Sequence, residues 1–154
     1  MKIHFKKILS LLAIAGFLFF VTACQKDAQK SIKDKLEEGD WSIISSKVAP
    51  GFFNGTDTIT DLYAIMDDCE KDNILRFFEN NIVSIDEGAT KCDSLDPQGI
   101  NGTWAFIEDN TKIVYDADTF NLIEVTSDKL TFSFSNYDDS TTVRTVTNIY
   151  NNIK

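Results

Sequence analysis

Hydrophobic and polar residues alternate along most of the chain from Trp41 onward. Short runs of β-branched and aromatic residues are separated by Asp, Asn, Gly and Ser, which is typical of antiparallel β-structure. In the clearest run, Leu130, Phe132 and Phe134 are expected on a buried face, with threonine and serine on the exposed face. The pattern predicts strands over 39–48, 60–67, 74–80, 82–86, 103–108, 112–116, 120–127, 129–136 and 142–151.

The connections between these strands are short and rich in turn-forming residues. Turns are expected at 54–56, 101–103, 109–110, 127–128 and 137–140. Eight or nine consecutive strands without a long crossover favour an all-β, antiparallel up-and-down barrel over a Greek-key sandwich, because closure removes exposed sheet edges. A barrel of eight strands either fills with side chains or holds one small ligand. Before the sheet, Ile32 and Leu36 have the i, i+4 spacing of a short helical turn within 29–38.

The N-terminus has the pattern of a cleaved signal peptide. Three lysines precede a nearly continuous apolar run over 8–21, which is too short to cross a bilayer comfortably. A buried N-terminal helix is the alternative, but the run has no polar stripe. The following Val21-Thr22-Ala23-Cys24 resembles a bacterial lipobox, which implies cleavage before Cys24 and a diacylglycerol on its thiol. The expected organisation is a signal peptide over 1–23, a flexible tether over 24–35 and a barrel domain over 36–154.

The lipobox resemblance also implies a location. Acyl chains on Cys24 would anchor the protein stably to the outer membrane of the cell envelope without a spanning helix. The next residues, Gln25-Lys26-Asp27, resemble the short acidic export signal of surface-displayed Bacteroidota lipoproteins. The same residues also suit a solvated tether, so the periplasmic face and the cell surface both remain open.

Charge and histidine content exclude several function classes. The full chain has a net charge of −9, and removal of 1–23 takes away three lysines and no acid, leaving 12 basic and 24 acidic residues and a net charge of −12. This acidity argues against a nucleic-acid partner. The only histidine, His4, lies in the removed segment, which excludes a histidine base, a Ser/His/Asp triad and a histidine metal site. We therefore expect no catalytic residues and no cofactor.

Two cysteines remain after lipidation, Cys69 and Cys92. Outside the inner membrane disulfides persist, so these two residues are expected to form a structural disulfide bond. A redox pair and a free nucleophile are the alternatives. Neither has support in a Cys-x-x-Cys spacing or an activating histidine.

Several motifs together resemble the lipocalin-like domain of Bacteroidota lipoproteins. Gly39-Asp40-Trp41 follows the short helical segment, Cys69 and Cys92 bracket a hairpin, and Gly102-Thr103-Trp104 opens a later strand. The resemblance covers about 36–150 and implies that Gly39, Trp41, Gly102 and Trp104 are structural residues, with Trp41 packing across the closed end of the barrel. The Thr-Asp-Tyr motif of secreted lipocalins is absent. Arg144 is the candidate for the late arginine that packs on Trp41, and solvent exposure is its alternative.

Candidate ligand contacts are few. Phe52 and Phe53, beside Pro50 and Gly51, are expected either as an apolar lid at the barrel mouth or as a loop tucked onto the barrel. The carboxylates at 67, 68, 70 and 72 could hold calcium, but they lack the spacing of a calcium-binding loop. A solvated helix-capping turn is the favoured interpretation, and no metal site is expected.

Two functions remain for a non-enzymatic lipoprotein of unknown oligomeric state. In the first, the barrel binds a small hydrophobic or amphipathic ligand. In the second, the barrel is filled, and its surface or loops contact an envelope protein or a glycan. The two differ in cavity volume, because ligand pockets begin at about 300 Å³.

Overall fold

The computed structural model describes residues 29–137 and 142–154. It contains one antiparallel sheet in the order β2-β1-β3-β4-β5-β6-β7-β8-β9, which the β1–β9 pairing closes. The elements are α1 (Ile32–Glu38), β1 (Asp40–Phe53), β2 (Thr58–Asp61), α2 (Leu62–Ile65), α3 (Asp68–Lys71), β3 (Ile74–Phe77), β4 (Ile82–Asp86), β5 (Gly99–Ile107), β6 (Lys112–Tyr115), β7 (Asp118–Val125), β8 (Lys129–Tyr137) and β9 (Val143–Asn152). Eight of these strands, β1 and β3 to β9, form a closed antiparallel up-and-down barrel, and β2 is an extra strand on β1. The expected fold class is confirmed.

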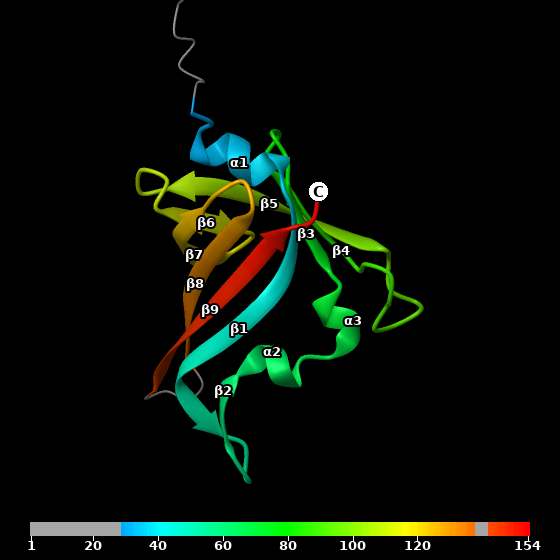
Figure 1. Ribbon diagram of the computed structural model, residues 1–154, viewed down its shortest axis with the longest axis vertical. Helices are drawn as coiled ribbons and strands as arrows, with labels where there is room; N and C mark the ends of the chain where they lie inside the picture. The colour runs from blue at the N-terminus through cyan, green and yellow to red at the C-terminus, as the bar shows by residue number, and fades with distance from the viewer. Residues whose placement is uncertain (1–28, 138–141) are drawn as a thin grey trace, which may run out of the picture.

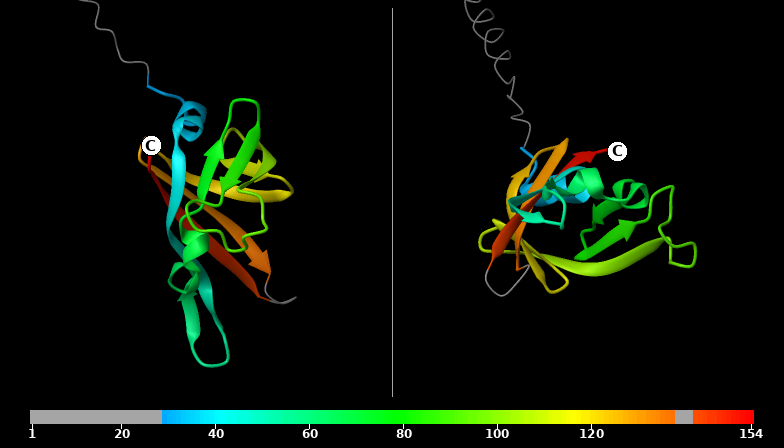
Figure 2. Two further views of the ribbon diagram at one scale, coloured as in Figure 1. Left: turned by 90° about the vertical axis from the view of Figure 1, so that its right-hand side faces the viewer. Right: turned by 90° about the horizontal axis from the view of Figure 1, so that it is seen from below.

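The long strand β1 closes the barrel on both sides. It pairs with β9 from Trp41 to Ala49, but with β3 only over three register pairs, from Asp40 to Ser42. Its far end pairs instead with β2, and this hairpin projects from the barrel at the end opposite α1 (Figure 1). The two helices α2 and α3 lie beside β1 in the stretch where β3 does not reach it (Figure 2).

Helix α1 covers one end of the barrel (Figure 1). It begins with a capping box in which Ser31 Oγ accepts from Asp34 N at 3.0 Å and Asp34 accepts from Ser31 N at 3.0 Å. Leu36 then points into the barrel and is fully buried. The helical turn expected within 29–38 is confirmed, and its first turn occupies the end of the segment assigned to the tether.

The apolar core lies directly beneath this helix. It contains Leu36, Trp41, Leu75, Phe77, Val83, Trp104, Ile113, Leu130 and Phe132. Phe77 meets Trp104 edge to face at a centroid distance of 5.2 Å, an arrangement favoured by the ring quadrupoles. This half of the barrel is filled with side chains.

Arg76 links three strands around the short β1–β3 pairing. From β3, its Nε lies 3.1 Å from Asp40 on β1, and its Nη1 lies 3.1 Å from Asp86 on β4. Asp86 also accepts hydrogen bonds from Gln98 Nε2 and the Gly88 N–H, both at 3.0 Å. These bonds, with the Arg76 charge, lower the pKa of the Asp86 carboxyl. The carboxylate is therefore held in its charged form between β4 and the start of β5.

The prediction of a strand over 60–67 is wrong. Strand β2 ends at Asp61, whose Oδ1 accepts from the Ala64 N–H at 3.2 Å and caps α2. A side-chain cap of this kind competes with continuation of the strand. The first strand is also longer than expected, since β1 continues to Phe53 before a turn in which Asn54 Oδ1 accepts from Thr56 N and Asp57 N.

Two further local expectations are wrong. Segment 101–103 is not a turn but part of β5, where the Thr103 N–H donates to Asp116 Oδ1 at 3.0 Å. Thr131 and Ser133, expected on an exposed face, are buried at 6% and 7% exposure. Strand β8 is paired on both sides, so the short Thr131 side chain lies between its larger register partners Glu124 and Ile149.

The expected signal peptide over 1–23, Cys24 and the first residues of the expected tether lie outside the described residues, as does most of the turn expected at 137–140. No helix in the described ranges is long and apolar enough to cross a membrane.

Candidate functional site: a cavity inside the barrel

The part of the barrel farther from α1 contains a cavity of about 280 Å³, which shares Leu75, Phe77, Ile113 and Phe132 with the core. Every strand of the barrel except β1 and β5 contributes to its wall. Its ten lining residues are Leu75, Phe77, Ile85, Ile113, Tyr115, Phe120, Phe132, Phe134, Asn148 and Tyr150. The alternation of side chains along a strand explains why these residues share the cavity wall, because side chains at i and i+2 point to the same face of the sheet.

Aromatic rings form much of this wall. Phe120 packs edge to face against Phe132 at 5.1 Å and against Phe134 at 5.3 Å, and it stacks with Tyr115 at 6.5 Å. Phe132 lies 5.1 Å from the Tyr150 ring. These mutual contacts hold each ring in place, so the cavity is preformed rather than a gap between loose side chains.

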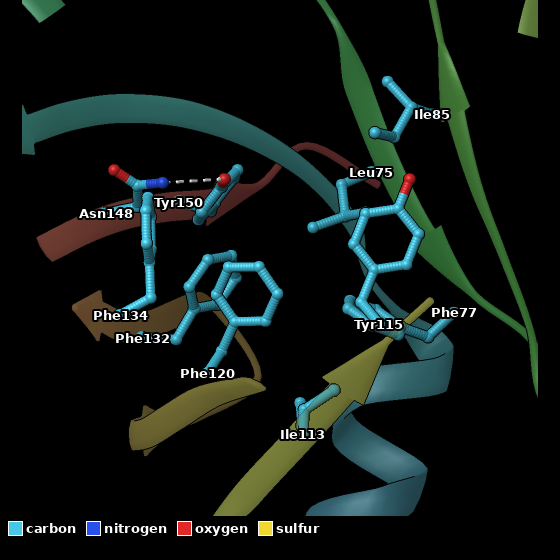
Figure 3. A pocket seen from close by; sticks show the side chains of 10 residues that line it. All are labelled: Leu75, Phe77, Ile85, Ile113, Tyr115, Phe120, Phe132, Phe134, Asn148 and Tyr150. Carbon is cyan, nitrogen blue, oxygen red and sulfur yellow. Dashed lines mark hydrogen bonds between the residues drawn. The ribbon is translucent and has the colours of Figure 1, made fainter. Parts of the chain in front are cut away.

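The polar atoms of the cavity lie in two places. Asn148 and Tyr150, together with Phe134, are at one side, and Tyr115 lies at the other with Leu75 and Ile85 (Figure 3). The Asn148 Nδ2–H donates to the Tyr150 hydroxyl at 3.5 Å, a long hydrogen bond. Asn148 Oδ1 is buried and has no hydrogen-bond partner.

None of the lining residues carries a charge at neutral pH. Burial raises the pKa of Tyr150 to about 12, and burial together with the Asp116 charge raises the pKa of Tyr115. Both hydroxyls therefore keep their protons. The cavity offers apolar contacts and neutral hydrogen-bonding groups, and it supplies neither a nucleophile with a base nor a pair of carboxylates.

A second hollow of about 290 Å³ adjoins the first. It shares Phe120 and Phe134 with the cavity and is otherwise lined by Asp118, Thr119 and Ser135. The two phenylalanine rings thus separate an apolar interior from a polar depression between β7 and β8.

Phe52 and Phe53, expected as ligand contacts, do not line this cavity. They are at the end of β1 rather than in a loop. The Arg144 guanidinium lies 5.9 Å from the Phe52 ring centroid, and Phe53 is 68% exposed. Their part in ligand binding stays a prediction.

None of the family-motif residues lines the cavity, and Gly39 and Trp41 lie at the end of the barrel covered by α1. Trp41 is fully buried and donates from Nε1 to the Leu36 carbonyl oxygen at 2.9 Å. A Cβ on Gly39 would lie 2.3 Å from this indole, so only glycine permits the close approach. The second motif repeats the arrangement, since Trp104 Nε1 donates to the Phe78 carbonyl oxygen at 3.1 Å and a Cβ on Gly102 would lie 2.6 Å from the Asp116 carboxylate.

Arg144 does not pack on Trp41. The register pairs Trp41 with Asn152 and Ala49 with Thr145, which puts the arginine at the opposite end of β9. There its Nη1 donates to the carbonyl oxygens of Pro50 and Gly51 at 3.0 and 2.6 Å. The arginine therefore binds the far end of β1 rather than the capped end of the barrel.

Cys69 and Cys92 form the expected disulfide bond, with a Cα–Cα distance of 5.2 Å. It joins α3 to the loop between β4 and β5. The neighbouring carboxylates serve the backbone: Glu70 Oε2 accepts from Asp67 N, and Asp72 Oδ2 accepts from Ala89 N and Thr90 N. Within the described ranges, no three His, Cys, Asp or Glu side chains come close enough to hold a metal ion.

Sequence reasoning missed the polar part of the cavity. The alternation in 130–135 predicted the inward faces of Phe132 and Phe134, but nothing local distinguishes Asn148 from the other asparagines of the C-terminal segment. The one available signal is the i, i+2, i+4 relation of Val146, Asn148 and Tyr150, which places an amide on an otherwise apolar face.

No protein-family model matches the chain, and no curated protein sequence matches it. Among solved structures, the chain is similar to bovine odorant-binding protein in complex with a selenium-containing odorant, with a TM-score of 0.47 and 13% identity over 86% of this chain and 78% of that chain. The complex of the same bovine protein with undecanal has a TM-score of 0.47 and 11% identity, covering 84% and 78%. A deswapped triple mutant of the bovine protein has a TM-score of 0.42 and 12% identity, covering 73% and 71%.

Proposed function

We propose that this protein is a lipid-anchored lipoprotein of the cell envelope that binds a small hydrophobic or amphipathic molecule inside its barrel without transforming it. The observation that carries the proposal is the preformed cavity of about 280 Å³ with its wall of aromatic and aliphatic side chains. Such a lining favours binding because it removes apolar ligand surface from water without a cost in charge burial.

The volume sets the size of the ligand. A dry cavity of about 150 Å³ holds benzene, so the present cavity suits a molecule of about 10 to 12 non-hydrogen atoms. It lies just below the usual lower end of ligand pockets, at about 300 Å³. The alternative hypothesis requires a filled barrel, but only the part beneath α1 is filled. The cavity in the remaining part favours ligand binding.

A tryptophan that fills the cavity should weaken ligand binding. Ile85 lines the cavity, and Ile85→Trp is expected to weaken binding of naphthalene at least about tenfold, because the larger side chain occupies the space that the ligand needs. Equilibrium dialysis measures the binding of naphthalene to both proteins.

The matched control is Ile123→Trp, at an isoleucine that is 59% exposed and outside the lining, and it should bind naphthalene like the unmodified protein. If the unmodified protein binds no naphthalene, or if Ile85→Trp binds it equally well, ligand binding in this cavity is refuted.

The anchor belongs to the same proposal and rests on the lipobox resemblance of Val21-Thr22-Ala23-Cys24. The described chain starts beside α1, at one end of the barrel (Figure 1). An N-terminal anchor would therefore leave the opposite end of the barrel facing away from the attachment. An acidic protein is repelled by anionic lipid headgroups, and the acyl chains must therefore supply the membrane affinity.

Cys24→Ala should release the protein from the membrane. In cells that process lipoproteins, the variant is expected in the aqueous phase after detergent phase separation, whereas the unmodified protein partitions into the detergent phase. Cys69→Ala/Cys92→Ala is the control, because it removes the two other cysteines but leaves Cys24 in place. Detergent partition that survives Cys24→Ala would show that the anchor assignment is wrong.

A further inference from the structure

Asn148 is the polar residue of the cavity whose hydrogen-bonding capacity is least used. It projects from β9 into a wall of phenylalanine and aliphatic side chains, and its Oδ1 is buried without a partner. The only hydrogen bond of its side chain in the described structure is the long contact of 3.5 Å from Nδ2 to the Tyr150 hydroxyl. A buried amide oxygen in this state is unfavourable unless something else in the cavity donates to it.

The cavity-lining neighbours of Asn148 on β8 carry no hydrogen-bond donor in their side chains. Its register partner on β8 is Phe132, and the rings of Phe132 and Phe134 offer no N–H or O–H. On the other side, Asn148 is paired with Ser46 on β1, a buried residue. Neither Ser46 nor any other described residue donates to Asn148 Oδ1, so a molecule bound in the cavity can supply a hydrogen bond to it.

The charge of the ligand is restricted by the same wall. The ten lining residues contain no Lys, Arg, His, Asp or Glu, and both tyrosines stay protonated at neutral pH. A carboxylate or an ammonium group entering the cavity would lose its hydration without gaining a counter-charge. A neutral hydroxyl or amide N–H loses less and gains a partner.

We infer that the cavity selects an uncharged ligand of about 10 to 12 non-hydrogen atoms that carries a hydrogen-bond donor, with Asn148 Oδ1 as the acceptor. The inference rests on the proposed ligand binding and specifies its chemistry. The apolar body of the ligand lies against the rings of Phe120 and Phe132, and its donor faces β9.

Four probes of similar shape test this selection by equilibrium dialysis: naphthalene, 1-naphthol, 1-methoxynaphthalene and 1-naphthoate. The unmodified protein should bind 1-naphthol about tenfold more tightly than naphthalene or 1-methoxynaphthalene, a difference that corresponds to about 1.4 kcal/mol. It should bind 1-naphthoate more weakly than naphthalene. Equal binding of 1-naphthol and 1-methoxynaphthalene would overturn the need for a donor, and tight binding of 1-naphthoate would overturn the need for neutrality.

Asn148→Leu assigns the preference to the amide. This variant should bind 1-naphthol no more tightly than naphthalene, while naphthalene binding stays within about twofold of the unmodified protein and shows that the cavity is intact. Asn121→Leu, at an exposed asparagine on β7 outside the lining, is the control and should keep the full preference. A preference for 1-naphthol that survives Asn148→Leu would refute the role of Asn148.

The two levels of proposal fail separately. If naphthalene binding responds to Ile85→Trp but 1-naphthol has no advantage, the donor inference is wrong and ligand binding stands. If none of the four probes binds the unmodified protein, both are wrong.

Discussion

Replacing Trp41 with alanine should lower the free energy of unfolding by about 3–5 kcal/mol, the usual cost of truncating a buried tryptophan. Trp41 has no exposed surface, and it packs with Leu36 and Gly39 at the capped end of the barrel. Its loss leaves a cavity there and leaves the Leu36 carbonyl without the indole N–H at 2.9 Å. Urea denaturation followed by circular dichroism measures the change.

A graded second variant guards against complete unfolding. Trp41→Phe keeps an aromatic ring but loses the hydrogen bond and part of the volume, so its cost should lie between those of the unmodified protein and Trp41→Ala. Phe53→Ala is the matched control, because this aromatic side chain is 68% exposed and its loss should change stability by no more than about 0.5 kcal/mol. A cost for Trp41→Ala as small as that of Phe53→Ala would mean that α1 and Trp41 do not hold the barrel closed.

Removing the disulfide bond should cost about 3 kcal/mol, because it spans a sequence separation of 23 and restricts the unfolded chain. The double variant Cys69→Ala/Cys92→Ala and the unmodified protein in dithiothreitol should show the same shift of the urea midpoint. The contact between the end of α3 and the loop that joins β4 to β5 should survive, since Asp72 Oδ2 still accepts from Ala89 N and Thr90 N at 3.0 and 2.8 Å.

Dithiothreitol added to the double variant is the control and should have no effect, because the described barrel then has no cysteine left to reduce. A midpoint that is unchanged in the double variant would show that the hydrogen bonds of Asp72 and the strand pairing hold this region by themselves. If dithiothreitol lowers the urea midpoint of the unmodified protein but the double variant keeps the original midpoint, the alanine side chains themselves stabilise the protein and mask the loss of the bond.

Much of the barrel was predictable because strand alternation is a local signal. The run from Leu130 to Ser135 gave the position and inward face of β8, and Ser127-Asp128 gave the turn before it. Local reasoning failed where a side chain caps a helix, as Asp61 does after β2, or where a turn-like sequence is held in a strand, as Asn101-Gly102-Thr103 is in β5. In each case a hydrogen bond of one side chain outweighs the general preference of the segment.

The sequence predicted the apolar character of the site but not the residues that form it. An abundance of aromatic residues in an eight-stranded barrel indicated an apolar interior, but the selected pair, Phe52 and Phe53, lies outside the cavity. The lining residues come from six strands between positions 75 and 150 and meet only because the β1–β9 pairing closes the sheet. No local pattern encodes that closure.

By itself, the sequence determined the antiparallel alternation, the Gly-x-Trp pairing at the barrel's start, the pairing of Cys69 with Cys92 and the lack of histidine in the expected mature chain. The alternation, the cysteine pair and the histidine count follow from composition and local pattern, whereas the Gly-x-Trp packing is implied by the family resemblance. Tertiary structure decided how the interior is divided. Leu36 and Trp41 fill one half, whereas the other half stays hollow with the Asn148 amide in its wall, because barrel closure and strand register alone determine which inward side chains meet.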